Sequence, residues 1–269
     1  MPLTPINGID LYYELHGSAA DAGGTPPLVA VAGLASDSQS WMPVVGPLAE
    51  HRRLVLFDNR GCGRSQPQDA ASGIDAMAAD CIALADHLGL ERFDLLGHSM
   101  GGFVALTCAL RHPERVHRLI LANTAASSGA RNDSLFADWA ATLAGGMDPA
   151  VWFRNFFYWI FTPGFFARPD VVGEALRLAL DYPHPQSPAG FSAQAAAMCG
   201  FDCRGRLAEL RAPALALCAE RDLIFPPDEA LADLRAIPGA EVVVVPGQAH
   251  ALHVEAPAQF LAPVLDFLD

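Results

Sequence analysis

The pentapeptide at 97–101 reads Gly-His-Ser-Met-Gly and sets Ser99 in a G-x-S-x-G pattern. It follows an apolar, strand-like run at 92–96 and precedes a run of helical spacing that ends before Pro113. A serine on a tight strand-to-helix turn requires glycines beside it, because other backbone passes close to both flanking positions. The helix that begins there points amide N–H groups toward the serine, where they would stabilise an acyl oxyanion. The pattern therefore predicts a nucleophilic serine.

A serine hydroxyl is a weak nucleophile near neutral pH, so Ser99 needs a base, and nine histidines are available. His250 follows the last strand-like run, 241–245, through a short loop, which predicts a position at the edge of a sheet. His253 lies three residues further along, at the start of an expected helix, and is the alternative base. His98 adjoins the serine but is expected to point away from it, into the turn. The sequence favours His250, because a loop gives a side chain reach that a helical face restricts.

The base in turn needs a carboxylate that fixes its tautomer and stabilises the imidazolium. The strand-like run 214–218 leads through residues 219–221 to Asp222, which predicts that Asp222 lies at the same sheet edge as the serine and the histidine. Glu220 and Asp228 are the alternatives, and either could be a solvated surface charge. Asn123 follows the preceding strand, where an acid could otherwise serve, but an amide stabilises an imidazolium less well. We therefore predict Asp222 as the acid, in the chain order serine, acid, histidine.

Strand-like and helix-like runs alternate on both sides of the pentapeptide. The runs at 28–32, 53–57 and 116–122 are apolar enough for buried strands, and 75–88 has the spacing of a helix. This alternation predicts a parallel sheet with helices on its faces. The turn at 58–65 contains G-x-G but lacks the third glycine and the following helix of a dinucleotide-binding fingerprint, so that class of protein is rejected.

The alternation of strand-like and helix-like runs stops after Asn123, and no further strand is expected before residue 214. Residues 127–207 are therefore expected to form a helical cap, inserted into a core domain made of 1–126 and 208–269. Within it, residues 151–166 include nine aromatic residues. This segment is shorter than the ~20 residues needed to cross a bilayer. These rings either pack the cap onto the main body or line an apolar substrate pocket. The pocket candidates are Trp152, Phe156, Phe157, Trp159 and Phe161.

Composition narrows the class of protein. The 269 residues are 52% hydrophobic, enough for one large core or a core with a small subdomain. A net charge of −13 disfavours nucleic acid and anionic lipid surfaces as partners. The sequence contains no lysine, which excludes Schiff-base catalysis, covalent pyridoxal phosphate and a P-loop.

Six scattered cysteines and the lack of a secretion signal predict a reduced, cytoplasmic protein. Cys199 and Cys203 have C-x-x-x-C spacing, but no second pair or nearby histidine completes a metal site. Buried thiols are expected there, with one disulfide as the alternative. We expect no metal and no cofactor.

Taken together, these features resemble the α/β-hydrolase superfamily, and the resemblance covers nearly the whole chain. The motifs that carry it are the pentapeptide with Gly102, the turn 58–65, the run 220–222, and His250 with Glu255 and Pro257 behind it. The resemblance implies a mostly parallel eight-stranded sheet flanked by helices, with a helical cap inserted after the sixth strand.

The resemblance also implies an oxyanion hole made by the backbone N–H groups of Leu34 and Met100. The family usually has His-Gly before the first of these positions, where this chain has Ala32-Gly33. The arrangement is similar to small bacterial esterases and to the enol-lactonase and aminoacrylate hydrolase groups. A serine nucleophile argues against epoxide hydrolases and haloalkane dehalogenases, since the resemblance implies aspartate at that site in those families.

These observations predict a serine hydrolase that cleaves a small or medium carboxylic ester or lactone with an apolar acyl portion, through an acyl-enzyme on Ser99. A C–C bond hydrolase or an acyltransferase could use the same residues, and a non-catalytic ligand receptor is a further alternative. The expected partner is a small-molecule substrate, with no nucleic acid and no membrane.

Overall fold

The strand-like runs form one eight-stranded sheet in the computed structural model, which describes residues 3–17, 24–50 and 52–269. The strands lie in the order β1-β2-β4-β3-β5-β6-β7-β8; the two pairs formed by β2 are antiparallel and the others are parallel. Their bounds are β1 (Leu3–Ile6), β2 (Ile9–His16), β3 (Leu28–Val31), β4 (Leu54–Phe57), β5 (Phe93–His98), β6 (Val116–Ala122), β7 (Ala214–Ala219) and β8 (Glu241–Val245). The prediction of a mostly parallel eight-stranded sheet is confirmed. The expected core segment 1–126 includes residues 1–2, 18–23 and 51, which lie outside the described residues.

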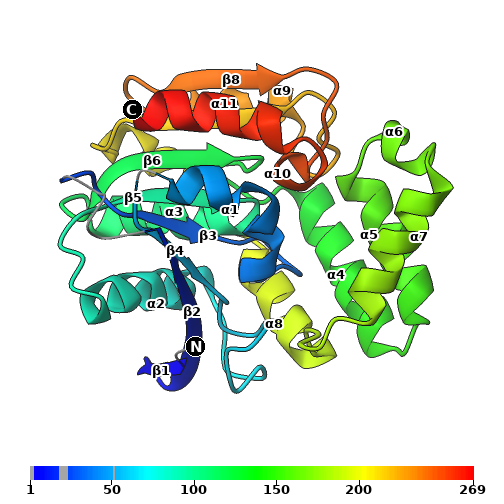
Figure 1. Ribbon diagram of the computed structural model, residues 1–269. Helices are drawn as coiled ribbons and strands as arrows, with labels where there is room; N and C mark the ends of the chain where they lie inside the picture. Colours follow the sequence, from blue (N-terminus) through cyan, green and yellow to red (C-terminus); the bar gives the residue numbers. More distant parts are fainter. Residues whose placement is uncertain (1–2, 18–23, 51) are drawn as a thin grey trace.

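Helices cover both faces of the sheet, which explains why β3, β4 and β7 are apolar at every position. In β3, Leu28 and Ala30 point to one face and Val29 and Val31 to the other, as the two-residue period of a strand requires. The first face packs against α1 and α11, which stand in front of the strands in Figure 1, and the second against α2, α3 and α9. These helices are α1 (Met42–Ala49), α2 (Ile74–His87), α3 (Met100–Arg111), α9 (Pro227–Leu234) and α11 (Pro257–Leu268).

The long interval between β6 and β7 is helical, so the insertion after the sixth strand is confirmed. We call its five α-helices the cap; they are α4 (Ala130–Ala144), α5 (Pro149–Ile160), α6 (Pro163–Phe166), α7 (Pro169–Leu180) and α8 (Pro188–Met198). Figure 1 shows α4 to α7 beyond the arrowheads of β6 and β8. The cap therefore faces the carboxyl ends of the strands, where α/β sheets bind ligands. The remaining short helices are η1 (Ser38–Trp41), η2 (Arg204–Glu209) and α10 (Leu252–Glu255).

Four of the cap helices begin with a proline, at positions 149, 163, 169 and 188. Proline suits the first turn of a helix, because the N–H that it lacks would have no partner there. Asp148, Thr162 and Ser187 precede three of these prolines, and each side chain accepts a hydrogen bond from a backbone N–H of the first turn. The local sequence thus fixes where the cap helices start.

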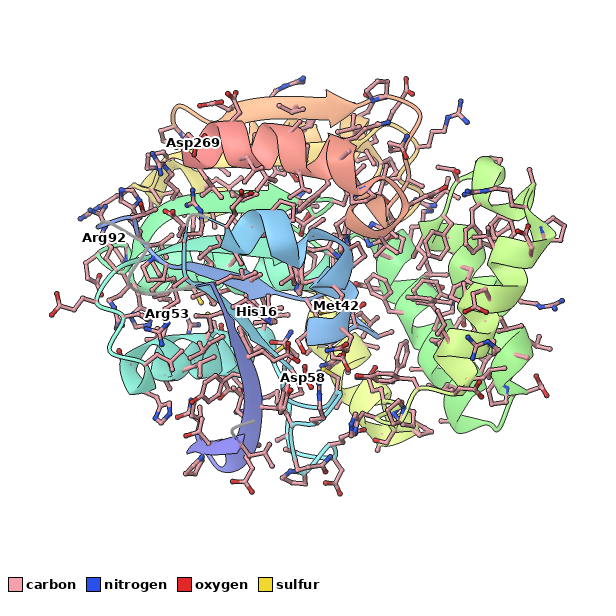
Figure 2. All side chains as sticks on the ribbon, in the orientation of Figure 1. His16, Met42, Arg53, Asp58, Arg92 and Asp269 are labelled. Atoms are coloured by element: carbon pink, nitrogen blue, oxygen red, sulfur yellow. The ribbon has the colours of Figure 1, made fainter. Side chains whose placement is uncertain are left out.

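The turn after β4, residues 58–65, connects the sheet to the cap. Figure 2 labels Asp58, which accepts hydrogen bonds from the backbone N–H groups of Ser38 and Arg64, at 2.9 and 2.8 Å. The carbonyl of Gly61 accepts a hydrogen bond from the side chain of Gln186, at 2.7 Å. This motif therefore links the turn that follows β4 to the segment before α8, at the base of the cap.

Within the described residues, no helix is both long enough and apolar enough to span a bilayer.

Candidate active site

Ser99 lies between β5 and α3 in a strained backbone conformation, with φ +55° and ψ −121°. A non-glycine residue at positive φ costs about 1–3 kcal/mol, which the surrounding structure must offset. The neighbouring glycines leave no room for a side chain: a Cβ on Gly97 would lie 2.2 Å from the carbonyl oxygen of Gly101, and one on Gly101 would lie 2.0 Å from that of Val31. The turn therefore has the close backbone approach that the G-x-S-x-G pattern predicts.

His250 and Asp222 form a buried pair behind this turn. The Nδ1–H of His250 donates a 2.8 Å hydrogen bond to Oδ2 of Asp222. The other carboxylate oxygen, Oδ1, accepts from the backbone N–H groups of Ile224 and Phe225, at 2.8 and 2.9 Å. Because both oxygens are engaged, the carboxylate is fixed in place. The contact leaves Nε2 of His250 as the lone-pair nitrogen of the ring, the tautomer that a general base needs.

Ser99 and His250 line one cavity of about 80 Å³ beneath the cap. Asp222 lies behind His250, so the structure brings the three residues together although they are far apart in the sequence. The cavity is also lined by Gly33 and Leu34 of the loop after β3. A Cβ on Gly33 would lie only 3.0 Å from Cβ of Ser99, so this loop passes directly over the serine. Leu34, in this loop, and Met100, the residue after Ser99, are thus both close to the proposed nucleophile.

The aromatic residues of 151–166 are divided between the cavity and the interior of the cap. Phe156 and Phe161 line the cavity. Trp152 stacks on Phe156 with a centroid separation of 5.3 Å and is buried in the main core cluster. Phe157 belongs to a separate cluster between α5 and α7, and Trp159 packs edge-on against Trp139. The rings of Trp152, Phe157 and Trp159 are not among the described residues that line the cavity.

Other apolar residues that the sequence analysis did not select also line the cavity. They include Phe136, Trp139, Ile160 and Ile224. The first two lie three positions apart on α4, a spacing that puts them on one helical face. That spacing is the feature of the sequence from which these two residues could have been predicted to face the cavity together.

His98 and Asn123 hold the loop of His250 in place. His98 was expected to point into the turn; instead its ring lines the cavity, and its Nε2–H donates to the backbone carbonyl of His250 at 2.9 Å. The side-chain amide of Asn123 donates to the same carbonyl at 2.6 Å. Burial, with His253 and His250 nearby, holds the pKa of His98 well below its usual range, so its ring is neutral. The base is thus positioned through its backbone as well as through Asp222.

The alternative acids and the alternative base have other surroundings. Glu220 is exposed and accepts a hydrogen bond from the backbone N–H of Gly247, and Asp228 is exposed in the first turn of α9. His253 lines the cavity, but none of the described carboxylates is hydrogen-bonded to its ring. Burial, with His250 nearby, lowers the pKa of His253 to about 3. Of the two candidate bases, only His250 is paired with an acid.

The end of α5 is bonded to the segment that follows His250. The N–H of Ala251 donates to the carbonyl of Ile160 at 2.9 Å. The carboxylate of Glu255, in α10, accepts hydrogen bonds from the backbone N–H and the hydroxyl of Thr162, at 2.9 and 2.5 Å. The cap and the loop of the base are therefore directly connected.

All six cysteines are free thiols, so the alternative of a disulfide between Cys199 and Cys203 is wrong. Cys203 is buried, as expected, but Cys199 is exposed at the end of α8, which corrects the expectation of two buried thiols. Among the described residues, no three His, Cys, Asp or Glu side chains are grouped in a way that could hold a metal ion.

Comparisons with known proteins identify the family of this chain. Residues 26–257 match the family described as alpha/beta hydrolase fold. RutD of Agrobacterium fabrum, which is named as a proposed carbamate hydrolase, is 30% identical over 272 residues, covering 96% of this chain and 98% of that protein. RutD of Rhizobium rhizogenes, named in the same way, is 31% identical over 260 residues, covering 96% and 97%.

Two solved structures share the whole fold. The enol-lactonase from Burkholderia xenovorans LB400 superposes with a TM-score of 0.89 at 27% identity, covering 99% of both chains. A thermophilic esterase from Thermogutta terrifontis superposes with a TM-score of 0.85 at 28% identity, covering 99% of this chain and 96% of that one. Because the family match and these relatives span nearly all of the sequence, the chain belongs to the α/β-hydrolase fold family and is a hydrolase.

Proposed function

We propose that this hydrolase cleaves a small or medium carboxylic ester or lactone with an apolar acyl portion, through an acyl-enzyme on Ser99. The observation that carries the proposal is that His250, hydrogen-bonded to Asp222, lines the same cavity as a serine held at positive φ. A base fixed by an acid beside a strained serine is the arrangement that acyl transfer requires.

In the proposed reaction, the hydroxyl of Ser99 attacks the substrate carbonyl while Nε2 of His250 takes its proton. Asp222 stabilises the imidazolium through Nδ1–H. The backbone N–H groups of Leu34 and Met100 receive the oxyanion, each contributing about 3–4 kcal/mol to the stability of the transition state. His250 then protonates the departing alcohol oxygen. Water, activated by the same histidine, releases the acyl group from the serine.

The size of the cavity favours the smaller substrates of the proposed class. Its volume of about 80 Å³ is well below the roughly 300–1,000 Å³ of pockets that hold drug-sized ligands. Phe136, Trp139, Phe156 and Phe161 contribute apolar walls, which suit a short hydrocarbon portion. We therefore expect acyl groups of two to four carbons to react fastest.

A second candidate is hydrolysis of a carbamate. It is favoured by the RutD relatives, which cover 96% of this chain at 30–31% identity. A carbamate presents a carbonyl to the same nucleophile, so the proposed roles of Ser99, His250 and Asp222 do not change.

Two measurements test the proposal. A fluorophosphonate probe should label Ser99, located by mass spectrometry, and Ser99→Ala should remain folded but lose turnover of p-nitrophenyl esters. A panel of p-nitrophenyl esters, lactones and p-nitrophenyl carbamates then ranks the two candidates, and product analysis with added alcohols or amines detects acyl transfer. Retained turnover in Ser99→Ala contradicts the proposal, and tight binding without turnover indicates a receptor.

A further inference from the structure

The loop that carries Leu34 contains a second residue in a strained backbone conformation. Ala35, next to Leu34, has φ +58°. A non-glycine residue keeps such a conformation only where the surrounding structure holds it in place. The loop runs from the end of β3 to η1, and Gly33 and Leu34 line the cavity. The contacts that fix this loop therefore also fix the N–H of Leu34, the proposed oxyanion donor.

Three hydrogen bonds join the loop and the start of η1 to the turn after β4. The side-chain amide of Asn59 donates to the carbonyl of Ala32 at 3.1 Å. The thiol of Cys62 donates to the carbonyl of Ser36 at 3.5 Å. The backbone N–H of the first η1 residue donates to Asp58 at 2.9 Å. None of these three contacts comes from the insertion after β6.

Tyr182 lies between two cap helices, α7 and α8, and contacts the end of the same loop. Its hydroxyl donates a 2.5 Å hydrogen bond to Oδ2 of Asp37. Asp37 is 8% exposed, and its other carboxylate oxygen accepts from the backbone N–H of Gln39 at 2.9 Å, which caps the start of η1. One buried carboxylate thus joins the insertion to the loop that carries Leu34.

The segment that carries Tyr182 is itself fixed to the residues that follow β4. The backbone N–H of Ser187 donates to the side-chain oxygen of Gln68 at 2.6 Å, and the amide nitrogen of Gln68 donates to the carbonyl of Pro185 at 3.3 Å. Burial and the bond to Asp37 raise the pKa of Tyr182, so the phenol keeps its proton near neutral pH. Tyr182 is therefore a fixed hydrogen-bond donor to Asp37.

We propose that Tyr182 is a positioning residue: by holding Asp37, it keeps the loop of Leu34 in the conformation that the oxyanion requires. This inference rests on the proposed function and assigns part of its oxyanion stabilisation to a residue of the insertion. Tyr182 is not among the described residues that line the cavity, so it acts through the loop and not on the substrate. Because the oxyanion forms only during the reaction, the contribution of Tyr182 belongs to kcat and not to KM.

The first test is the steady-state hydrolysis of p-nitrophenyl butyrate by Tyr182→Phe, which keeps the ring and removes the hydroxyl. We expect kcat to fall about tenfold, the effect of one lost hydrogen bond to a carboxylate, while KM stays nearly unchanged. Tyr158→Phe, at a 64% exposed tyrosine of α5, is the matched control and should keep both constants. A rise in KM at the wild-type kcat, or wild-type values of both constants, overturns the proposal.

A double-mutant cycle tests whether Tyr182 acts through Asp37. Asp37→Ala alone should lower kcat at least as much as Tyr182→Phe, since it also removes the cap of η1. Adding Tyr182→Phe to Asp37→Ala should then have no further effect. A second tenfold loss in the double variant overturns the proposal, because the hydroxyl would then act on another group.

Hydrogen exchange reads the loop directly and needs no activity. In peptides that cover residues 33–41, backbone amides should exchange faster in Tyr182→Phe than in wild type or Tyr158→Phe. Equal rates overturn the proposal, and so does faster exchange throughout the chain, which would indicate general destabilisation. If wild type hydrolyses no ester, the proposed function fails, and the exchange rates still decide whether Tyr182 holds the loop.

Discussion

The side-chain amide of Asn123 donates a 2.6 Å hydrogen bond to the backbone carbonyl of His250. Asn123 follows β6 at φ +47°, and its own N–H donates to Leu217 in β7 at 2.8 Å. One residue thus connects the ends of two strands to the loop of the base. Position 123 could have held the acid of the triad; instead, its asparagine fixes the backbone of the proposed base, His250.

This contact predicts that Asn123→Ala lowers kcat about tenfold, because one hydrogen bond of about 1.4 kcal/mol no longer aligns His250. KM should change little, since Asn123 is not among the residues that line the cavity. Steady-state kinetics on a p-nitrophenyl ester measure both constants. A rise in KM with an unchanged kcat would show that the residue acts on binding rather than on the base.

The buried pair predicts a much larger effect for Asp222→Asn. An amide cannot enforce the Nδ1–H tautomer, and in comparable triads this change costs about 10⁴-fold in kcat. Asp228→Asn, at an exposed carboxylate of α9, is the matched control and should leave kcat unchanged. If the two variants are equally active, Asp222 is not the acid.

Two glycines predict opposite effects on stability. Gly101→Ala should lower the free energy of unfolding by at least about 3 kcal/mol, because its Cβ would lie 2.0 Å from backbone oxygen that cannot move away. Gly173→Ala, in the middle of α7, meets nothing within 4 Å and should raise it by about 0.5–1 kcal/mol. Urea unfolding followed by circular dichroism measures both. A tolerated alanine at 101 would mean that the elbow is looser than described.

His253 also predicts how stability depends on pH. Its pKa is about 3 in the folded protein and about 6.5 in the unfolded chain, so between these values only the unfolded state binds the proton. The free energy of unfolding should therefore fall as pH drops from 6.5 to 5, by up to about 1.4 kcal/mol per unit from this residue. His98, whose pKa is also lowered, contributes in the same direction. Urea midpoints at several pH values should show a shallower slope in His253→Phe than in wild type or His112→Phe, and equal slopes would contradict the assignment.

The fold was predictable because buried strands leave an unambiguous apolar pattern. The strand β1 was absent from the runs identified, although Asn7 and Gly8, at φ +46° and +82°, form the two-residue turn that Asn-Gly favours between paired strands. Fully buried strands such as β3 and β4 are apolar at every position. By contrast, β1 is a half-exposed strand of four residues at the edge of the sheet.

The site was less predictable where it depends on the direction in which a side chain points rather than on the residue type. Phe156 and Phe157 are adjacent on α5, but a helix rotates by about 100° per residue, so one faces the cavity and the other faces α7. The roles of His98 and Asn123 arise from contacts with a carbonyl more than 120 positions away, which no local periodicity encodes. The assignment of Ser99, Asp222 and His250 to catalysis remains a prediction that the variants above test.

The hydrogen bonds that join Ile160 and Thr162 of the cap to Ala251 and Glu255 have a mechanical consequence. Because these bonds join α5 to the short segment that carries His250, a displacement of α5 that keeps them also displaces the residues beside the proposed base. The position of the cap and the position of the imidazole are therefore coupled.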